Sequence, residues 1–224
     1  MTSTQAPLVF SPTPTPDSQA PKEIPQGASL IPLNGSPAFD LSSSSSYSTY
    51  YAQKAFDGDS YSSRWETDLL LYNSTGDFQN EASCSYCSTL KNMWSYDFPT
   101  FEQTSVSGEW IEIKFAAPVR IQGYAITALP DVAPASWKLM AGNPQNWGSF
   151  WLGMHSAQNE NRWSIAKDQT IYFEIPEQLQ GFEITVLRLV VSKTSGSKFV
   201  GINEIVFNGQ STGSSTFLVS YILC

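Results

Sequence analysis

The stretch Gly108-Glu109-Trp110-Ile111-Glu112-Ile113-Lys114-Phe115 alternates apolar and polar side chains near the middle of the chain. Successive side chains of an extended strand point to opposite faces, so this pattern places Ile111, Ile113 and Phe115 together on one face. Residues 119–127 continue in the same way after Ala117-Pro118, which we interpret as a turn. The stretch therefore predicts two neighbouring strands.

Strand signals recur along the second half of the chain. Residues 136–141, 170–175, 182–192 and 200–207 have the apolar and β-branched composition of strands, and Gly, Pro and Asn follow several of them. No long window shows a helical period, although residues 52–56 could form a single turn. Short strands separated by turn signals predict an all-β sandwich or jelly roll.

The composition of the chain excludes several classes of protein. Only 14% of the residues are charged, and 20 acidic against 12 basic residues give a net charge of −8. Nucleic-acid binders rely on clusters of Lys and Arg, and the sequence has no such cluster, so we expect no nucleic-acid partner. No window approaches the roughly 18 apolar residues of a membrane span. Residues 1–16 lack the basic and apolar regions of a signal peptide.

The first 45 residues differ from the rest of the chain because they hold eight of its 14 prolines. We expect residues 1–45 to form a Pro-rich extended or disordered arm, residues 46–210 the sandwich, and residues 211–224 a tail. The serine run at residues 42–46 is the expected hinge. Two interpretations of the arm stay open: a passive linker, or a segment that becomes ordered on a partner.

Residues 66–107 are polar and aromatic without a strand pattern, and we expect them to be a long irregular insertion loop. The pair Cys84 and Cys87 lies within it. Zinc needs four ligands, and neither His155 nor Cys224 has a suitable spacing, so a local disulfide or free thiols explain these cysteines better. The single histidine and the absence of a Gly-x-Ser-x-Gly elbow argue against a hydrolase triad, and we expect no catalytic residues.

Five motifs in order along the chain resemble those of discoidin domains, also called coagulation-factor type C domains. They are Ala55-Phe56-Asp57-Gly58-Asp59 with Ser63-Arg64-Trp65, and the segments 108–113, 136–139, 187–191 and 200–205. The resemblance covers about residues 46–209. It implies a galactose-binding-like jelly roll of two antiparallel sheets that recognises ligands through loops at one end. The family's known ligands are glycans, phospholipid head groups and proteins, and catalysis is not among its activities.

The resemblance also implies candidate site residues. The family's ligand-facing loops correspond to residues 46–51, 128–135 and 155–163, which offer Tyr50, Tyr51, Asp131, His155, Arg162 and Trp163. The alternative is that the two tyrosines cap the core and the others are ordinary loop residues. Many members of the family hold a structural calcium ion, for which the matching residues are Asp57, Asp59, Ser63 and Glu204. The alternative there is a hydrogen-bonded turn without metal.

A narrower resemblance rests on Trp65, the segment 72–76 and the segment 108–110, which are similar to discoidin modules encoded by large DNA viruses of algae and protists. It implies a minor capsid or surface protein of a virion, assembled in the host cytoplasm, whose arm contacts other virion subunits. The alternative is a carbohydrate-binding or cell-adhesion lectin outside any virion. Such a lectin would act on cell-surface glycans and reach the cell surface or the extracellular space by a non-classical route. The insertion at 66–107 departs from the family pattern and could replace its usual binding surface.

Overall fold

The computed structural model describes residues 39–69, 71–79, 90–97, 100–143, 151–163 and 169–212. These residues form strands and two single turns of 3-10 helix, which confirms the predicted all-β class. The first elements are β1 (Phe39–Ser43), η1 (Ala52–Ala55), β2 (Trp65–Glu66), β3 (Leu90–Asp97), β4 (Thr100–Val106) and β5 (Glu109–Ala128). The later elements are β6 (Pro134–Gly142), β7 (Trp151–Ala157), β8 (Gln169–Glu174), η3 (Glu177–Leu179), β9 (Ile184–Thr194), β10 (Gly201–Ile202) and β11 (Glu204–Ser211).

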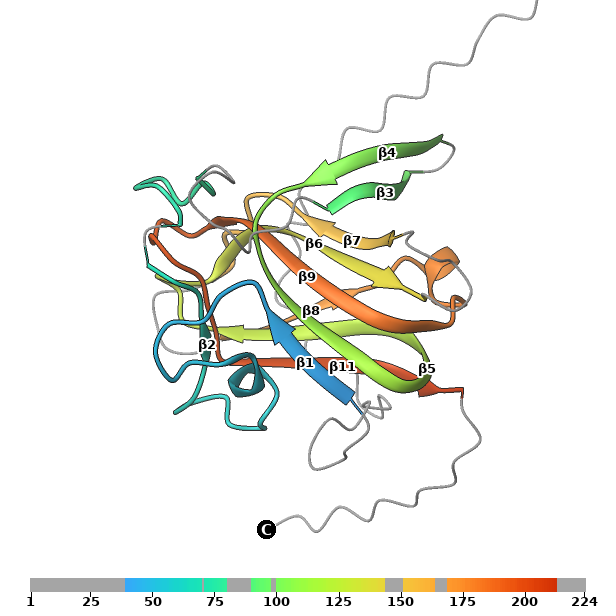
Figure 1. The fold of residues 1–224 in the computed structure, drawn as a ribbon, viewed down its shortest axis with the longest axis horizontal. Coiled ribbons are helices and arrows are strands. Elements are labelled where there is room, and N and C mark those ends of the chain that lie inside the picture. The colour runs from blue at the N-terminus through green and yellow to red at the C-terminus, as the bar shows by residue number, and fades with distance from the viewer. Residues whose placement is uncertain are drawn as a thin grey trace, which may run out of the picture.

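The long strand β5 belongs to both layers of the sandwich. Its first half lies between β1 and β9, in a layer that continues through β6, β7, β3 and β4, and its second half lies between β8 and β11. Figure 1 shows β5 bending back at its middle, where the chain leaves one layer for the other. The predicted turn at Ala117-Pro118 is therefore a bend within a continuous strand. Proline is tolerated at this point because the ladder with β1 ends at Phe115 and the ladder with β11 begins at Val119.

The core lies between the two layers, and the alternation along β5 supplies part of it. Ile111 and Ile113 are buried in the core, as predicted, and Phe115 packs against its edge. From the second half of β5, Tyr124 faces the same core and stacks on Phe173 of β8 with ring centroids 5.2 Å apart. Burying one such large side chain contributes roughly 1.5–3 kcal/mol, so this core holds the two layers together.

The insertion at residues 66–107 contains regular structure that its sequence did not predict. Strands β3 and β4 form an antiparallel hairpin, and β3 pairs in parallel with β7, so the hairpin extends the first layer at its edge. A hairpin that joins an existing sheet edge is held by backbone hydrogen bonds, which require no apolar alternation of its own. The expectation of an irregular loop is therefore wrong for residues 90–97 and 100–106.

The sandwich also begins earlier than residue 46. Strand β1 pairs with residues 111–115 of β5, and Ser44 is buried, so the serine run is partly a strand rather than a hinge. The arm up to residue 38, the tail from residue 213, and all three cysteines lie outside the described residues.

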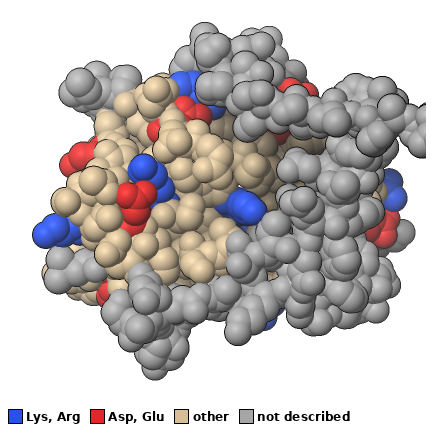
Figure 2. All heavy atoms as spheres, turned by 90° about the horizontal axis from the view of Figure 1, so that it is seen from above, with Lys and Arg blue, Asp and Glu red and all other residues tan. Residues whose placement is uncertain are grey.

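Charged side chains of the described residues are interspersed on the face shown in Figure 2, where blue and red groups lie near one another. Among the ion pairs of the described residues, Arg120 Nη2 lies 2.9 Å from Glu183 Oε1, and Lys193 Nζ lies 3.3 Å from Asp77 Oδ1. Within the described part of the chain, no helix has the length and apolar character needed to cross a membrane.

Candidate functional site

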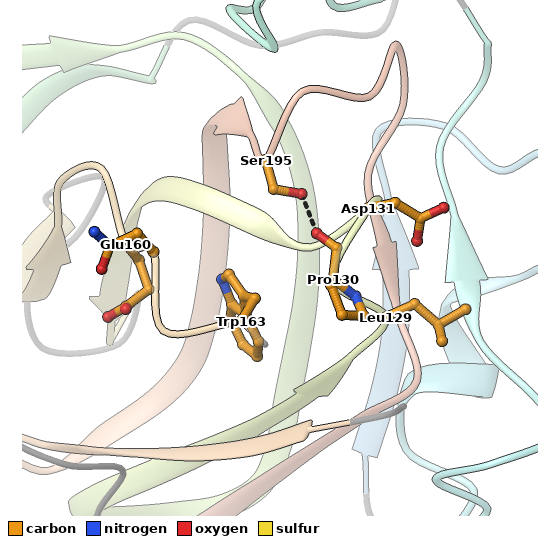
Figure 3. A pocket seen from close by; sticks show the side chains of 7 residues that line it. Leu129, Pro130, Asp131, Glu160, Trp163 and Ser195 are labelled. Carbon is orange, nitrogen blue, oxygen red and sulfur yellow. Dashed lines mark hydrogen bonds between the residues drawn. The ribbon is translucent and has the colours of Figure 1, made fainter. Parts of the chain in front are cut away.

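Three loops at one end of the sandwich line an open pocket with a volume of about 670 Å³. The loop after β5, the loop after β7 and the residue that follows β9 contribute its walls (Figure 3). Two of these segments are the loops that the sequence assigned to ligand binding. The lining residues are Leu129, Pro130, Asp131, Glu160, Asn161, Trp163 and Ser195.

The apolar wall of the pocket is held in place by hydrogen bonds. The ring of Trp163 is buried, and its Nε1 donates to the carbonyl oxygen of Pro134 at 2.8 Å. The Ser195 hydroxyl donates to the carbonyl oxygen of Pro130, as Figure 3 shows. Because these bonds tie side chains to the backbone of the loop after β5 and to the first residue of β6, the Trp163 ring and this loop form a fixed surface.

A paired carboxylate forms another side of the pocket. Glu160 accepts the backbone N–H of Arg162 at 2.8 Å and its guanidinium Nε at 2.9 Å. The Arg162 guanidinium in turn lies 5.2 Å from the centre of the Phe173 ring, a cation–π contact with the core. Burial alone would raise the pKa of Glu160, but the hydrogen bonds and positive charge of Arg162 outweigh it, so the pKa is lowered. Glu160 therefore presents an ionised, fixed hydrogen-bond acceptor.

Asp131, Asn161 and Ser195 are the exposed polar residues that line the pocket. The Asp131 carboxylate points away from Trp163 in Figure 3. A rigid aromatic wall beside carboxylate and amide groups is suited to a ligand that has one apolar face and several hydroxyl groups at its edge.

Of the six predicted ligand-binding residues, the structure brings Asp131 and Trp163 to the pocket, with Arg162 beside them as the partner of Glu160. Tyr50 and Tyr51 do not line the pocket. The guanidinium of Arg64 lies over the Tyr50 ring, 5.4 Å from the ring centre, and Tyr51 is half-exposed immediately before η1.

His155 belongs to strand β7 and faces the interior, so the predicted loop 155–163 begins later than its sequence indicated. Its Nδ1 lies 2.8 Å from the hydroxyl of Tyr124, which accepts a hydrogen bond from Trp137 Nε1 at 2.7 Å. Which of Tyr124 and His155 donates in this bond depends on the tautomer of the imidazole. His155 thus closes a structural network rather than contacting the pocket.

Sequence reasoning missed Glu160, Asn161 and Ser195. The spacing of Glu160 to Arg162 was a usable signal, because opposite charges two residues apart in a loop can form a fixed pair. Ser195 carried no such signal, since it reaches the pocket only through the pairing of β9 with β6.

The predicted calcium residues lie on the loop at residues 57–63 and at the start of β11. Ser63 Oγ is the centre of an oxygen cluster: it lies 2.7 Å from Asp57 Oδ2, 3.3 Å from the Asp59 carbonyl and 3.4 Å from the Lys54 carbonyl. The Asp59 carboxylate does not join this cluster, because it accepts the N–H groups of Tyr61 and Ser62.

Glu204 reaches the same loop through the Gly58 N–H, which donates to Oε2 at 2.9 Å. The pKa of Glu204 is raised to about 7: burial is the largest cause, the Gly58 hydrogen bond acts against it, and the negative charges of Asp57 and Asp59 add to it. Within the described residues, no three His, Cys, Asp or Glu side chains converge on one point. Carboxylate, hydroxyl and carbonyl oxygens are nevertheless the donors that calcium takes, so the chemistry of this loop fits that ion.

No family model matches the sequence, and the search of curated proteins gave no match. Solved structures do match. A family 89 glycoside hydrolase from Clostridium perfringens, in complex with 2-acetamido-1,2-dideoxynojirmycin, aligns with a TM-score of 0.52 and 18% identity over 87% of this chain. The match spans only 16% of that hydrolase.

A second match has nearly the same extent as the described sandwich. CpGH89CBM32-5 from Clostridium perfringens, in complex with GalNAc-β-1,3-galactose, aligns with a TM-score of 0.50 and 11% identity, covering 80% of this chain and 99% of that one. At these identities the likeness shows the fold alone. It confirms the discoidin-like β-sandwich that the sequence motifs predicted.

Proposed function

We propose that this protein is a non-catalytic glycan-binding module and that the pocket beside Trp163 is its binding site. The observation that carries the proposal is the position of this pocket, at the loop end of a discoidin-like sandwich, with a fixed aromatic wall and polar groups at its rim. The likeness to a module whose structure contains GalNAc-β-1,3-galactose supports the same class of ligand.

The charges of the pocket favour a neutral sugar. Glu160 is ionised and fixed by Arg162, and the exposed Asp131 adds a second carboxylate. Carboxylates accept hydrogen bonds from sugar hydroxyls, whereas an anionic sugar would meet like charge. The lowered pKa of Glu160 also makes it a poor proton donor near neutral pH, which supports binding without catalysis.

Calorimetric titration with GalNAc-β-1,3-galactose and with galactose tests the proposal. We expect Asn161→Ala and Asp131→Asn each to weaken binding about tenfold, which corresponds to about 1.4 kcal/mol. Asp40→Asn is the matched control, because Asp40 is an exposed carboxylate on β1, outside the pocket. If a panel of neutral glycans shows no binding to the folded protein, or if Asp40→Asn weakens binding equally, the proposal fails.

We also propose that the loop at residues 57–63 and Glu204 hold a structural calcium ion. Asp57, Ser63 and Glu204 would supply side-chain oxygens, and Lys54 and Asp59 would supply carbonyl oxygens. The ion would supply a positive charge beside the buried Glu204 carboxylate. This residue set joins the first loop of the sandwich to its last strand.

The virion role is a second hypothesis, and it rests on the arm. If the arm becomes ordered on neighbouring subunits, the free energy of that binding would come from residues 1–38, which the structure does not describe. The pocket lies in the described sandwich, so glycan binding is the function that we favour.

A further inference from the structure

A tight turn at residues 73–77 joins Tyr72 and Phe78, which form an antiparallel bridge. The N–H of Asn73 donates to the carbonyl oxygen of Asp77 at 2.9 Å, and the N–H of Gly76 donates to the carbonyl oxygen of Asn73 at 3.0 Å. Gly76 has a φ of +82°, and a Cβ there would lie 2.3 Å from the Thr194 carbonyl oxygen. Only glycine fits this position, so the turn is held closely against the end of β9.

The side chain of Asn73 organises the turn through its oxygen. Oδ1 accepts the backbone N–H groups of Thr75 and Asp77, both at 2.9 Å, and lies 2.7 Å from Thr75 Oγ1. An amide is planar, so an oxygen fixed inside the turn leaves Nδ2 on its other side. Ser74 and Thr75 are exposed at the tip.

Asn73-Ser74-Thr75 also has the sequence of an N-glycosylation acceptor, Asn-x-Thr with x other than proline. We propose that Nδ2 of Asn73 is an acceptor for N-linked glycosylation wherever the chain reaches a compartment that holds the glycosyl transferase. The donor would be an oligosaccharide carried on a polyprenyl diphosphate. Nδ2 would attack C1 of the first sugar and lose one proton as the N–C1 bond forms. The C1–O bond would break, and the polyprenyl diphosphate would leave with the electron pair.

The folded turn tolerates this modification without losing its hydrogen bonds. A glycosylated amide keeps Oδ1 and one N–H, so both backbone hydrogen bonds to Oδ1 remain. The Asn73 side chain also forms a hydrogen bond with the Asp77 carboxylate, for which the remaining N–H is still available. The bulky sugar would extend from an exposed turn, where N-linked glycans are found. The neighbouring hydroxyl of Thr75, which the acceptor motif requires, lies on the same exposed tip.

The test is to express the full chain behind a secretion leader in a eukaryotic cell that makes N-linked glycans. Asn34→Gln serves as the background, because Asn34-Gly35-Ser36 is a second acceptor triplet in the sequence. We expect the intact mass to fall on treatment with peptide N-glycosidase, and peptide mapping to find aspartate at position 73.

Three variants in this background make the result specific. Thr75→Ala should abolish the glycan while keeping the backbone bonds to Asn73 Oδ1, whereas Thr75→Ser and Ser74→Ala should retain it. An unchanged mass after enzyme treatment of the folded, secreted protein would overturn the proposal. A glycan that persists in Thr75→Ala would overturn it as well. Neither outcome depends on the glycan-binding pocket, so this proposal and the proposed function fail separately.

Discussion

Ser44 Oγ donates a hydrogen bond to Glu109 Oε2 at 2.8 Å and so joins two segments that are 65 residues apart in the sequence. The Ser45 hydroxyl donates to the same carboxylate oxygen, and Trp110 N–H donates to Ser44 Oγ at 2.8 Å. Glu109 is fully buried, so its carboxylate needs hydrogen-bond donors. Two of these donors are serine hydroxyls from the run that the sequence predicted to be a hinge. Ser44 and Ser45 therefore belong to the folded sandwich, because they supply hydrogen bonds to its buried carboxylate.

A truncation tests where the domain begins. We expect a chain that starts at residue 39 to unfold cooperatively close to the full-length chain, because it keeps β1 and both serines. A chain that starts at residue 47 loses the pairing with β5 and the donors to Glu109. An unsatisfied buried polar group costs about 1–3 kcal/mol, and more when charged, so the melting temperature should fall sharply. Equal melting curves by circular dichroism would contradict this role of β1.

The stability of the protein should depend on the ionisation of Glu109. Burial raises the pKa of Glu109, although the hydrogen bonds from Ser45 and Ser44 act in the opposite direction. A carboxyl group whose pKa is raised in the folded state contributes stability that is fully present at pH values below its ordinary pKa of about 4.3. This contribution is lost as the pH rises through the pKa of the folded state.

The measurement is urea unfolding at several pH values between 4 and 8. Glu109→Gln should reduce the decrease in unfolding free energy with rising pH, because the amide does not ionise. The decrease that remains should disappear when Glu204→Gln is added, since the pKa of Glu204 is also raised. Glu177→Gln is the control, since Glu177 is exposed, and it should leave the slope unchanged. A wild-type slope that survives in Glu109→Gln would assign the pH dependence to another group.

Arg188 holds a buried ion pair on the outer face of the first layer. Its guanidinium lies between the rings of Trp110 and Trp151, 4.1 and 4.8 Å from their centres, and its Nε donates to Glu112 at 2.8 Å. Removal of one partner of a buried pair costs about 3–5 kcal/mol, so Arg188→Leu should strongly destabilise the protein. Lys114 Nζ lies 3.7 Å from Glu112 Oε1, but this side chain is mostly exposed, so it would replace little of the ion pairing that Glu112 loses.

Denaturant unfolding of a matched set checks this expectation. Arg188→Leu combined with Glu112→Leu should recover much of the loss, because no unpaired charge stays buried. Arg120→Ala removes the partner of Glu183 in an exposed pair and should cost less than about 1 kcal/mol. Similar losses for Arg188→Leu and Arg120→Ala would show that the Arg188 pair is effectively solvated.

Calcium should raise the melting temperature if the loop at residues 57–63 binds it. A ligand present at 100 times its dissociation constant stabilises by about 2.7 kcal/mol. Asp57→Asn and Glu204→Gln should reduce the shift. Asp59→Asn should retain most of it, because the Asp59 carboxylate faces Tyr61 and Ser62 and only its carbonyl lies in the oxygen cluster. No shift at millimolar calcium would favour a hydrogen-bonded turn without metal.

The alternation of side chains was sufficient to predict the strands that supply the core. Ile111 and Ile113 fall on the buried face, and the predicted segments 136–141, 170–175 and 182–192 overlap β6, β8 and β9. This information is local, because a period of two residues is a property of each strand by itself. The motifs around these strands also predicted the discoidin-like sandwich.

Only the tertiary structure decided which strands meet and what their ends enclose. The bend in β5, the attachment of β3 to β7 and the burial of Glu109 each depend on pairing between distant segments. The pocket has the same origin, since Asp131, Glu160 and Ser195 come from three loops that converge only when the layers pack. Contacts between distant segments produce no periodic pattern in the sequence, because they depend on which strands pair with one another in the folded sheet.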